Sequence, residues 1–213
     1  MAKPLIQVAL DSLDYDQTLA LARQAAPYVD IIEIGTPCLK VNGLALVKAI
    51  KAAHPDKLLF VDLKTMDAGY YEAEPFFKAG ADITTVLGTA DMGTIKGVID
   101  VANAYGKQAQ VDLINVRDKA KVASEAAKLG AHIIGIHTGI DQQLAGQTPF
   151  ADLAALIAQG LSVKVSVAGG IKQSTVQKVV QAGPSIVVVG GAITGSNAPE
   201  TSAREIRELV ASA

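Results

Sequence analysis

Eight short apolar runs, rich in β-branched residues, recur along the chain and alternate with longer segments of helical periodicity. The runs occupy residues 5–10, 29–34, 57–63, 81–87, 109–114, 131–136, 162–167 and 185–190. Because apolar and polar residues do not alternate strictly within them, the runs indicate strands covered on both faces, and the helices between them indicate parallel βαβ units. Eight such units predict an α/β fold whose parallel sheet closes into a (β/α)8 TIM barrel, and they favour it over an open doubly wound sheet.

The segments between the runs carry signals for helix starts and ends. Asp14 and Asp91 stand just before helical stretches, and aspartate often caps the first turn of a helix. Five glycines stand just past such stretches, where a left-handed residue commonly ends a helix: Gly80, Gly106, Gly130, Gly160 and Gly183. No linker or change in composition divides the chain, so we expect residues 1–213 to form a single barrel domain.

The composition points to a small-molecule partner. Lysine and arginine number 19 against 21 aspartates and glutamates, a net charge of −2, so no basic field would recruit nucleic acid or an anionic membrane. Tryptophan is absent, which disfavours base stacking, and no stretch has the length and apolar character of a membrane span. Cys38 is the only cysteine, which suits the cytoplasm, and we expect it to be a packing residue.

Polar residues and glycine pairs close almost every apolar run. In order they are Asp11, Glu33, Asp62 with Lys64, Thr84 or Thr85, Asp112, His137, Gly169-Gly170 and Gly190-Gly191. In a parallel barrel the carboxyl ends of the strands share one mouth, and polar side chains there point into the active site. We therefore expect these groups to line one site.

Two carboxylates on neighbouring strands predict a metal site. Glu33 and Asp62 could converge on one hard divalent cation, with water and substrate oxygens completing the shell, as Mg²⁺ prefers. The alternative is that each carboxylate pairs with a lysine or caps a helix.

The segment VDLKTMDAG, residues 61–69, crowds three charges at one strand end. Asp62 and Lys64 share a side along an extended chain, and Asp67 begins the following loop. A lysine held among carboxylates stays protonated and can stabilise negative charge on an enolate oxygen. The alternative is a structural ion pair, with Asp67 as the cap of a helix that begins near Ala68.

His137 is the candidate acid or base, because a histidine at the mouth of the barrel can exchange protons near neutral pH. The alternative is a histidine that anchors a loop by hydrogen bonds. We expect His54 and His132 to be structural.

The glycine pairs follow strands seven and eight, where many barrels bind phosphate through backbone N–H groups. Gly169 with Gly170, and Gly190 with Gly191, therefore predict a phosphorylated substrate. The alternative is that each pair serves a tight turn.

Seven segments spread over essentially the whole chain resemble the 3-hexulose-6-phosphate synthase family, within the orotidine-5′-monophosphate decarboxylase suprafamily. They read LIQVALD, VDIIEIGTP, VDLKTMDAG, VDLINV, GIHTGID, SVAGGI and VVVGGAI. The D-x-K-x-x-D motif of Asp62, Lys64 and Asp67 is the specific one, and the glycine pairs are less diagnostic.

This resemblance implies a Mg²⁺-dependent, reversible aldol condensation. Formaldehyde and D-ribulose 5-phosphate would give D-arabino-3-hexulose 6-phosphate through a 1,2-enediolate. Asp11 and Lys64 would position the substrate, Glu33 and Asp62 would bind Mg²⁺, and His137 would transfer protons. In this suprafamily the second aspartate of the motif commonly reaches the neighbouring subunit's site, so Asp67 implies a homodimer with shared active sites.

Three alternatives stay open. A 3-keto-L-gulonate-6-phosphate decarboxylase typically carries arginines where this chain has Thr138-Gly139-Ile140 and Gly191-Ala192-Ile193. A ribulose-5-phosphate 3-epimerase would need metal-binding histidines on several strands. A non-catalytic phosphosugar-binding barrel would not need Lys64 among carboxylates. Residues 138–149 form a long loop that could close over substrate, and the direction of the reaction is open.

Overall fold

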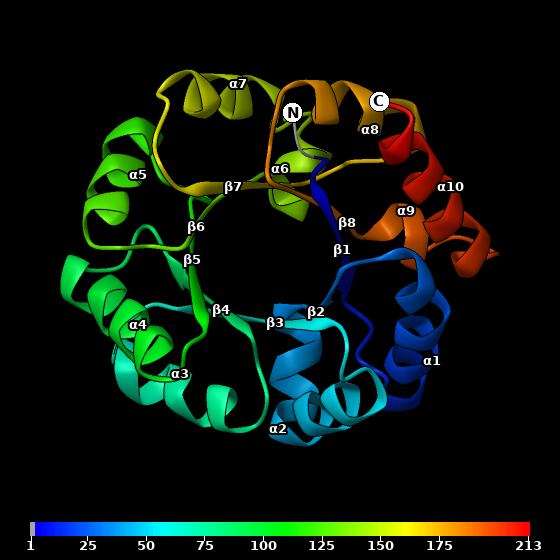
Figure 1. Ribbon diagram of the computed structural model, residues 1–213, viewed down its shortest axis with the longest axis horizontal. Coiled ribbons are helices and arrows are strands. Elements are labelled where there is room, and N and C mark those ends of the chain that lie inside the picture. The colour runs from blue at the N-terminus through cyan, green and yellow to red at the C-terminus, as the bar shows by residue number, and fades with distance from the viewer. Residues whose placement is uncertain (1–2) are drawn as a thin grey trace.

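The computed structural model describes residues 3–213, and its eight parallel strands close into a barrel (Figure 1). The strands are β1 (Leu5–Leu10), β2 (Ile31–Ile34), β3 (Leu58–Thr65), β4 (Ile83–Leu87), β5 (Gln108–Asp112), β6 (Ile133–His137), β7 (Lys164–Ala168) and β8 (Ile186–Val189). They pair in chain order, and β1 pairs with β8 to complete the ring. The predicted (β/α)8 fold is confirmed, and the strand bounds differ from the predicted runs by at most two residues at either end.

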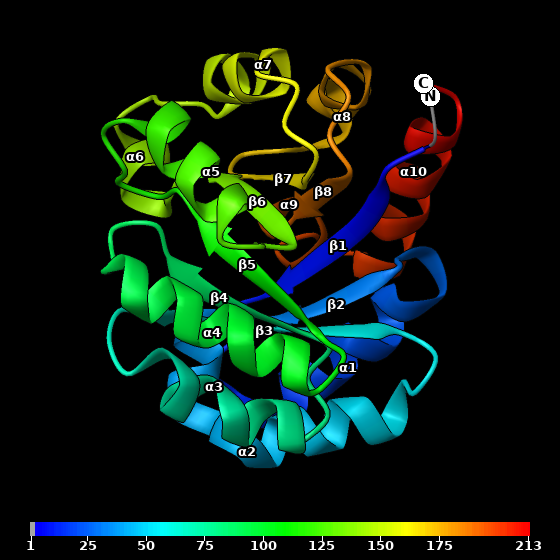
Figure 2. The ribbon, with the colours of Figure 1, turned by 60° about the vertical axis from the view of Figure 1, so that its left-hand side comes forward.

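The long helices surround the barrel as an outer ring, whereas the short α6 (Ile140–Leu144) lies inside that ring in the view of Figure 1. The helices are α1 (Tyr15–Ala25), the 3₁₀ helix η1 (Ala26–Tyr28), α2 (Thr36–Ala53), α3 (Gly69–Lys78), α4 (Met92–Ala104), α5 (Lys119–Lys128), α6 (Ile140–Leu144), α7 (Phe150–Ala158), α8 (Gln173–Gln181), α9 (Gly191–Thr194) and α10 (Pro199–Ala211). The helices α2, α3 and α4 lie side by side along one flank, as Figures 1 and 2 show. Within residues 3–213 no helix has the length and apolar character that a membrane span requires.

The predicted helix limits are largely confirmed. Asp14 caps α1 by accepting a hydrogen bond from Gln17 N at 2.7 Å, and Asp91 caps α4 by accepting one from Gly93 N at 2.7 Å. The five predicted glycines end their helices with φ between +63° and +112°, a range that side chains disfavour.

Two apolar cores support the barrel. Outward-facing strand residues such as Val8 and Val61 pack with the helices, and inward-facing ones form a smaller cluster inside the barrel. The inner cluster contains Ile31, Phe60, Ile83, Ile133, Ile186 and Val188. These side chains fill the lower barrel, so space for a ligand remains only above them, toward the carboxyl ends of the strands.

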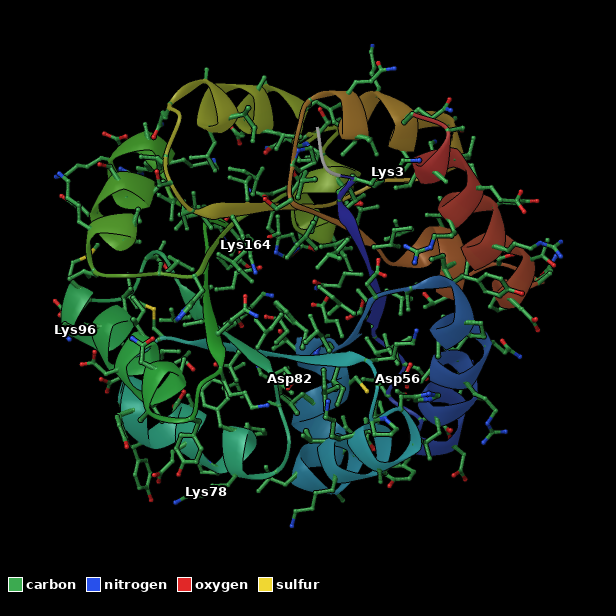
Figure 3. The ribbon with its side chains drawn as sticks, in the orientation of Figure 1. Lys3, Asp56, Lys78, Asp82, Lys96 and Lys164 are labelled. Carbon is green, nitrogen blue, oxygen red and sulfur yellow. The ribbon has the colours of Figure 1, made fainter. Side chains whose placement is uncertain are left out.

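Ion pairs fasten the opposite end of the barrel. Asp82, which precedes β4 and is labelled in Figure 3, accepts from Lys51 Nζ at 2.8 Å and Lys107 Nζ at 2.6 Å. Asp30 holds the guanidinium of Arg207 on α10 through two hydrogen bonds of 2.9 and 3.0 Å. Polar groups at this end of a barrel serve stability.

Candidate active site

A cavity of about 870 Å³ opens at the carboxyl ends of the strands. The site residues predicted from sequence that line it are Asp11, Glu33, Asp62, Lys64, His137, Gly169, Gly170, Gly190 and Gly191. Asp112 lines it too. The barrel therefore brings together nine of the ten residues to which the sequence assigned a role, and the tenth, Asp67, does not line the cavity.

The end of β3 is not a regular strand. The pairing register between β3 and β4 shifts between Val61 and Thr65, and Lys64 has a φ of +47°. The backbone N–H of Lys64 donates to Thr85 Oγ1 at 2.8 Å, which holds this irregular turn in place. The expectation of an extended chain from Asp62 to Lys64 is wrong at this point, because a β-bulge redirects the lysine.

The bulge places the Lys64 ammonium between two carboxylates. Lys64 Nζ donates to Asp62 Oδ2 and lies 3.5 Å from Asp112 Oδ2. Burial lowers the pKa of Lys64, but the charges of Asp62 and Asp112 raise it by more, so the net shift is upward. Lys64 is therefore a permanent cation at the centre of the site.

The two oxygens of Asp62 are both engaged. Oδ1 accepts from Thr85 Oγ1 at 2.7 Å, and Oδ2 accepts from Thr36 Oγ1 at 2.8 Å as well as from Lys64. Of the two threonines proposed at the end of β4, Thr85 therefore faces the site. Thr84 is buried, and its hydroxyl has no hydrogen-bond partner within residues 3–213. Neighbouring residues of a strand point to opposite faces, which explains the difference.

Glu33 carries the most perturbed carboxyl group of the site. It is buried on β2 and accepts a hydrogen bond from Gln7 Nε2 at 2.7 Å. Desolvation and the neighbouring Asp62 charge raise the pKa of Glu33 to about 8. A second positive charge beside Glu33 and Asp62 would relieve this excess of negative charge.

The oxygen donors of the site fit a hard cation. No three His, Cys, Asp or Glu side chains of the described residues converge on one point as a ready-made metal site. Mg²⁺ does not require such a cage, since it is usually bound through one or two carboxylates plus water and substrate oxygens. Beside Glu33, the buried oxygen Oε1 of Gln7 has no hydrogen-bond partner within residues 3–213. It is a further oxygen that a bound water could satisfy.

His137, the last residue of β6, pairs with Asp112 at the end of β5. The distance between His137 Nδ1 and Asp112 Oδ2 is 2.9 Å, and Asp112 Oδ1 accepts from Ile114 N at 2.9 Å. Burial alone would lower the pKa of His137, but the hydrogen bond and charge of Asp112 outweigh it and raise that pKa. Burial likewise raises the pKa of Asp112, and its contacts with His137 and Lys64 lower it by more.

Asp112 stands at a strand end in the sequence, but no feature of the sequence predicted a specific role for it. Its role depends on contacts with Lys64 and His137, which reach it from β3 and β6, on opposite sides of β5. These contacts form only in the folded barrel. The strand-end rule that found His137 also marks Asp112, so the signal was present.

Asp11 faces the cavity at the end of β1. Desolvation by the cavity wall and the nearby Asp62 charge raise the pKa of Asp11, although Lys64 and His137 act against the shift. A Cβ atom added to Gly35 would lie 1.9 Å from Asp11 Oδ1. Glycine at position 35 is thus needed for Asp11 to take this place.

The glycine pairs form one wall of the cavity at the ends of β7 and β8. Gly169 and Gly170 have φ values of +114° and +66°, so the expected tight turn is present. Their N–H groups donate to no other residue of the described chain, which leaves them available for an acceptor in the cavity. A Cβ atom on Gly191 would meet no atom within 4 Å, so this position faces open space.

Asp67 is exposed and is not the cap of α3. Its Oδ1 accepts from the N–H of Ala68 at 2.7 Å, but α3 begins at Gly69 after Ala68 in the left-handed region. The alternative of a helix cap is therefore wrong, since the left-handed turn at Ala68 separates Asp67 from the first turn of the helix.

Other predicted features have clear places. Cys38 is fully buried beside Thr18, as expected for a packing residue. His132 accepts a hydrogen bond from Ala109 N at 3.1 Å, a structural contact at the far end of the barrel. The segment 138–149 contains the short helix α6, and part of it lines the cavity.

Comparison with known proteins fits this geometry. Residues 4–206 match the orotidine 5′-phosphate decarboxylase / HUMPS family. The chain belongs to this family. A 3-hexulose-6-phosphate synthase of Methylomonas aminofaciens is 64% identical over 205 residues, which cover 96% of this chain and 98% of that protein. This relative is a lyase, and the chain is an enzyme of the same class.

Solved structures of the orotidine 5′-phosphate decarboxylase / HUMPS family superpose closely. The crystal structure of 3-hexulose-6-phosphate synthase from Salmonella typhimurium has a TM-score of 0.95 and 39% identity, covering 98% of this chain and 99% of that one. A 3-keto-L-gulonate-6-phosphate decarboxylase from Vibrio cholerae has a TM-score of 0.87 and 29% identity, covering 99% of each chain. Sequence identity is thus higher with the synthases.

Proposed function

We propose that this enzyme catalyses the reversible, Mg²⁺-dependent aldol condensation of formaldehyde with D-ribulose 5-phosphate to D-arabino-3-hexulose 6-phosphate. The observation that carries the proposal is the Lys64 ammonium, held between Asp62 and Asp112 with His137 on the far side of Asp112. This arrangement puts a fixed cation and a proton carrier in one cavity, which formation and use of an enediolate requires. The 64% identity to a 3-hexulose-6-phosphate synthase supports the choice of reaction.

Proton transfer is assigned to His137. Its Nδ1 is occupied by Asp112, so Nε2 is the nitrogen that is free to take the C1 proton of the ketose. The C1–H electrons then form the enediolate, whose oxygen charge the Lys64 ammonium stabilises. Asp11 helps to position the substrate beside Lys64. The enediolate carbon attacks formaldehyde to form the new C–C bond, and His137 returns its proton to the resulting alkoxide.

Glu33 and Asp62 are the proposed Mg²⁺ ligands. Their carboxylates are the oxygen donors that Mg²⁺ prefers. The negative charge of Asp62 lies near Glu33, and a bound cation would offset the repulsion between the two carboxylates. When bound, Mg²⁺ supplies Lewis-acid polarisation of substrate oxygens. The glycine wall at Gly169–Gly170 and Gly190–Gly191 takes the substrate phosphate through backbone N–H groups, at the place where barrels commonly bind phosphate.

A homodimer that shares its active sites is part of the proposal. Apolar side chains are exposed around Asp67: Met66 is 53% exposed, Tyr70 46% and Tyr71 83%. Val41, on the neighbouring helix α2, is 62% exposed. An apolar patch of this kind fits an interface between copies, through which Asp67 would reach the partner's cavity.

The test is direct incubation of the protein with ribulose 5-phosphate, formaldehyde and Mg²⁺. We expect formaldehyde loss matched by appearance of the hexulose 6-phosphate, and arrest of both by a chelator. The Lys64→Ala variant is the matched control for background reaction. If no formaldehyde is consumed and CO2 is released from 3-keto-L-gulonate 6-phosphate, the proposed synthase activity is wrong and the enzyme is a decarboxylase.

A further inference from the structure

Carboxylates dominate the charge that lines the cavity. They belong to Asp11, Glu33, Asp62, Asp112 and Asp141. Lysines line it at two positions, and one of them, Lys64, is already engaged by Asp62 and Asp112. A dianionic phosphate that enters such a cavity meets repulsion from these acids unless a further cation stands near it.

Lys172 is the second lysine of the cavity lining. It lies two residues after Gly170, between the end of β7 and the start of α8. Its side chain is exposed and forms no ion pair with any carboxylate of residues 3–213, including Asp141 on the same rim. Its ammonium group is thus available to a ligand.

The backbone of Lys172 is held in place although its side chain is not. Its N–H donates to Thr175 Oγ1 at 3.1 Å, and its carbonyl accepts from the N–H of Thr175 at 2.9 Å. The lysine stem therefore starts from a fixed point beside the turn of Gly169–Gly170, whose N–H groups have no acceptor in the described chain. A group bound by those N–H donors lies within reach of the flexible ammonium.

We propose that Lys172 binds the phosphate of the ketose substrate and supplies the positive charge that this acidic cavity otherwise lacks at its glycine wall. The inference rests on the proposed function in that it takes a phosphorylated ketose as the ligand. Lys172 contacts the phosphate, which does not react, so its contribution is to binding rather than to proton transfer. Backbone N–H groups give the site its shape, and Lys172 gives it affinity for the dianion over an uncharged sugar.

Calorimetric binding of D-ribulose 5-phosphate and of inorganic phosphate tests the proposal without requiring turnover. The variant is Lys172→Met, and Lys172→Arg is the rescue. Lys178→Met is the matched control, because Lys178 is an exposed lysine of α8, the helix that Lys172 precedes, and it does not line the cavity. We expect Kd for ribulose 5-phosphate to rise about tenfold in Lys172→Met, as for loss of a hydrogen bond to a charged group. Lys172→Arg should recover most of this loss, and Lys178→Met should match the wild type.

Salt dependence separates a charge contact from a structural role. Kd of the wild type for ribulose 5-phosphate should rise with ionic strength more steeply than Kd of Lys172→Met. Equal Kd values or equal salt slopes in the two proteins would overturn the proposal, as would a wild type that binds neither ligand. If instead the phosphosugar binds and depends on Lys172 but no formaldehyde is consumed, the proposed reaction fails and the role of Lys172 stands.

Discussion

His137 Nδ1 and Asp112 Oδ2 lie 2.9 Å apart, on the last residues of the neighbouring strands β6 and β5. The contact fixes the orientation of the imidazole, which lines the cavity, and leaves Nε2 as the nitrogen that Asp112 does not occupy. Lys64 Nζ stands 3.5 Å from the same oxygen of Asp112, so one carboxylate connects the proposed proton carrier to the proposed charge stabiliser. Asp112 thereby raises the pKa of His137 and, together with Asp62, holds the ammonium group of Lys64.

Asp112→Asn should lower turnover by about 100-fold, the lower range for loss of an effective general base. The amide cannot stabilise a protonated imidazole, so the raised pKa of His137 should fall. An NMR titration of the His137 ring measures that pKa, and exchange of the C1 proton into deuterated water measures the step. An unchanged pKa with normal exchange would separate Asp112 from proton transfer.

Lys64→Ala should reduce turnover by about 100-fold or more, because a fixed charge that acts on the transition state is removed. The fold should persist, since Lys64 lies on the cavity side of β3 and keeps part of its surface exposed. Steady-state kinetics measure the effect, and circular dichroism checks the fold. Near-normal activity in a folded variant would remove Lys64 from the mechanism.

Glu33→Gln should stabilise the metal-free protein at alkaline pH. The pKa of Glu33 is about 8 in the folded state against an ordinary value of 4.5. Between these values the folded state keeps a proton that the unfolded state has released, so stability falls as pH rises through this range. The amide removes that loss. The free energy of unfolding of the variant minus that of the wild type should therefore be larger at pH 9 than at pH 5, by more than about 1 kcal/mol.

Urea unfolding in the presence of a chelator measures the difference for Glu33→Gln at both pH values. Added Mg²⁺ should then stabilise the wild type at pH 9 and leave Glu33→Gln nearly unaffected, as expected for a ligand of the cation. A pH-independent gap between the two proteins would contradict the raised pKa of Glu33.

Gly191→Val should weaken binding of ribulose 5-phosphate at least about tenfold, because the new side chain would occupy space that the phosphate needs. The position is suited to the test, since a Cβ atom there meets nothing within 4 Å. Gly170→Val is less informative because Gly170 has a φ of +66°, where any side chain is strained. Calorimetry measures binding and thermal unfolding checks the fold. Unchanged affinity would mean that the phosphate does not bind beside Gly191.

Mixing two inactive variants, Asp67→Ala and Lys64→Ala, should restore activity if subunits exchange and share sites. In a mixed dimer one cavity carries both changes, and the other carries neither. Sedimentation of the separate variants establishes that both are dimers. Failure of the mixture to regain activity, with exchange demonstrated by labelled subunits, would place Asp67 outside the partner's site.

The sequence by itself determined the barrel and the rim of residues at its mouth. Eight apolar runs separated by helices predict closure, and the carboxyl ends of parallel strands must meet at one end. The positions of Glu33, Lys64 and His137 in the sequence were therefore enough to predict that they share one cavity. The alternative role considered for Asp67, a helix cap, is not formed, because a cap depends on the backbone angles of its neighbour Ala68, which no residue type dictates.

Tertiary structure decided how the rim residues pair. The bulge between Val61 and Thr65 turns Lys64 toward Asp112, a contact that depends on register across three strands. The pKa of Glu33 depends on burial and on the distance to Asp62, and neither quantity can be obtained from the sequence alone. Strand periodicity is a local property that the sequence carries, whereas charge pairing inside a closed barrel arises only when distant segments meet at a fixed separation.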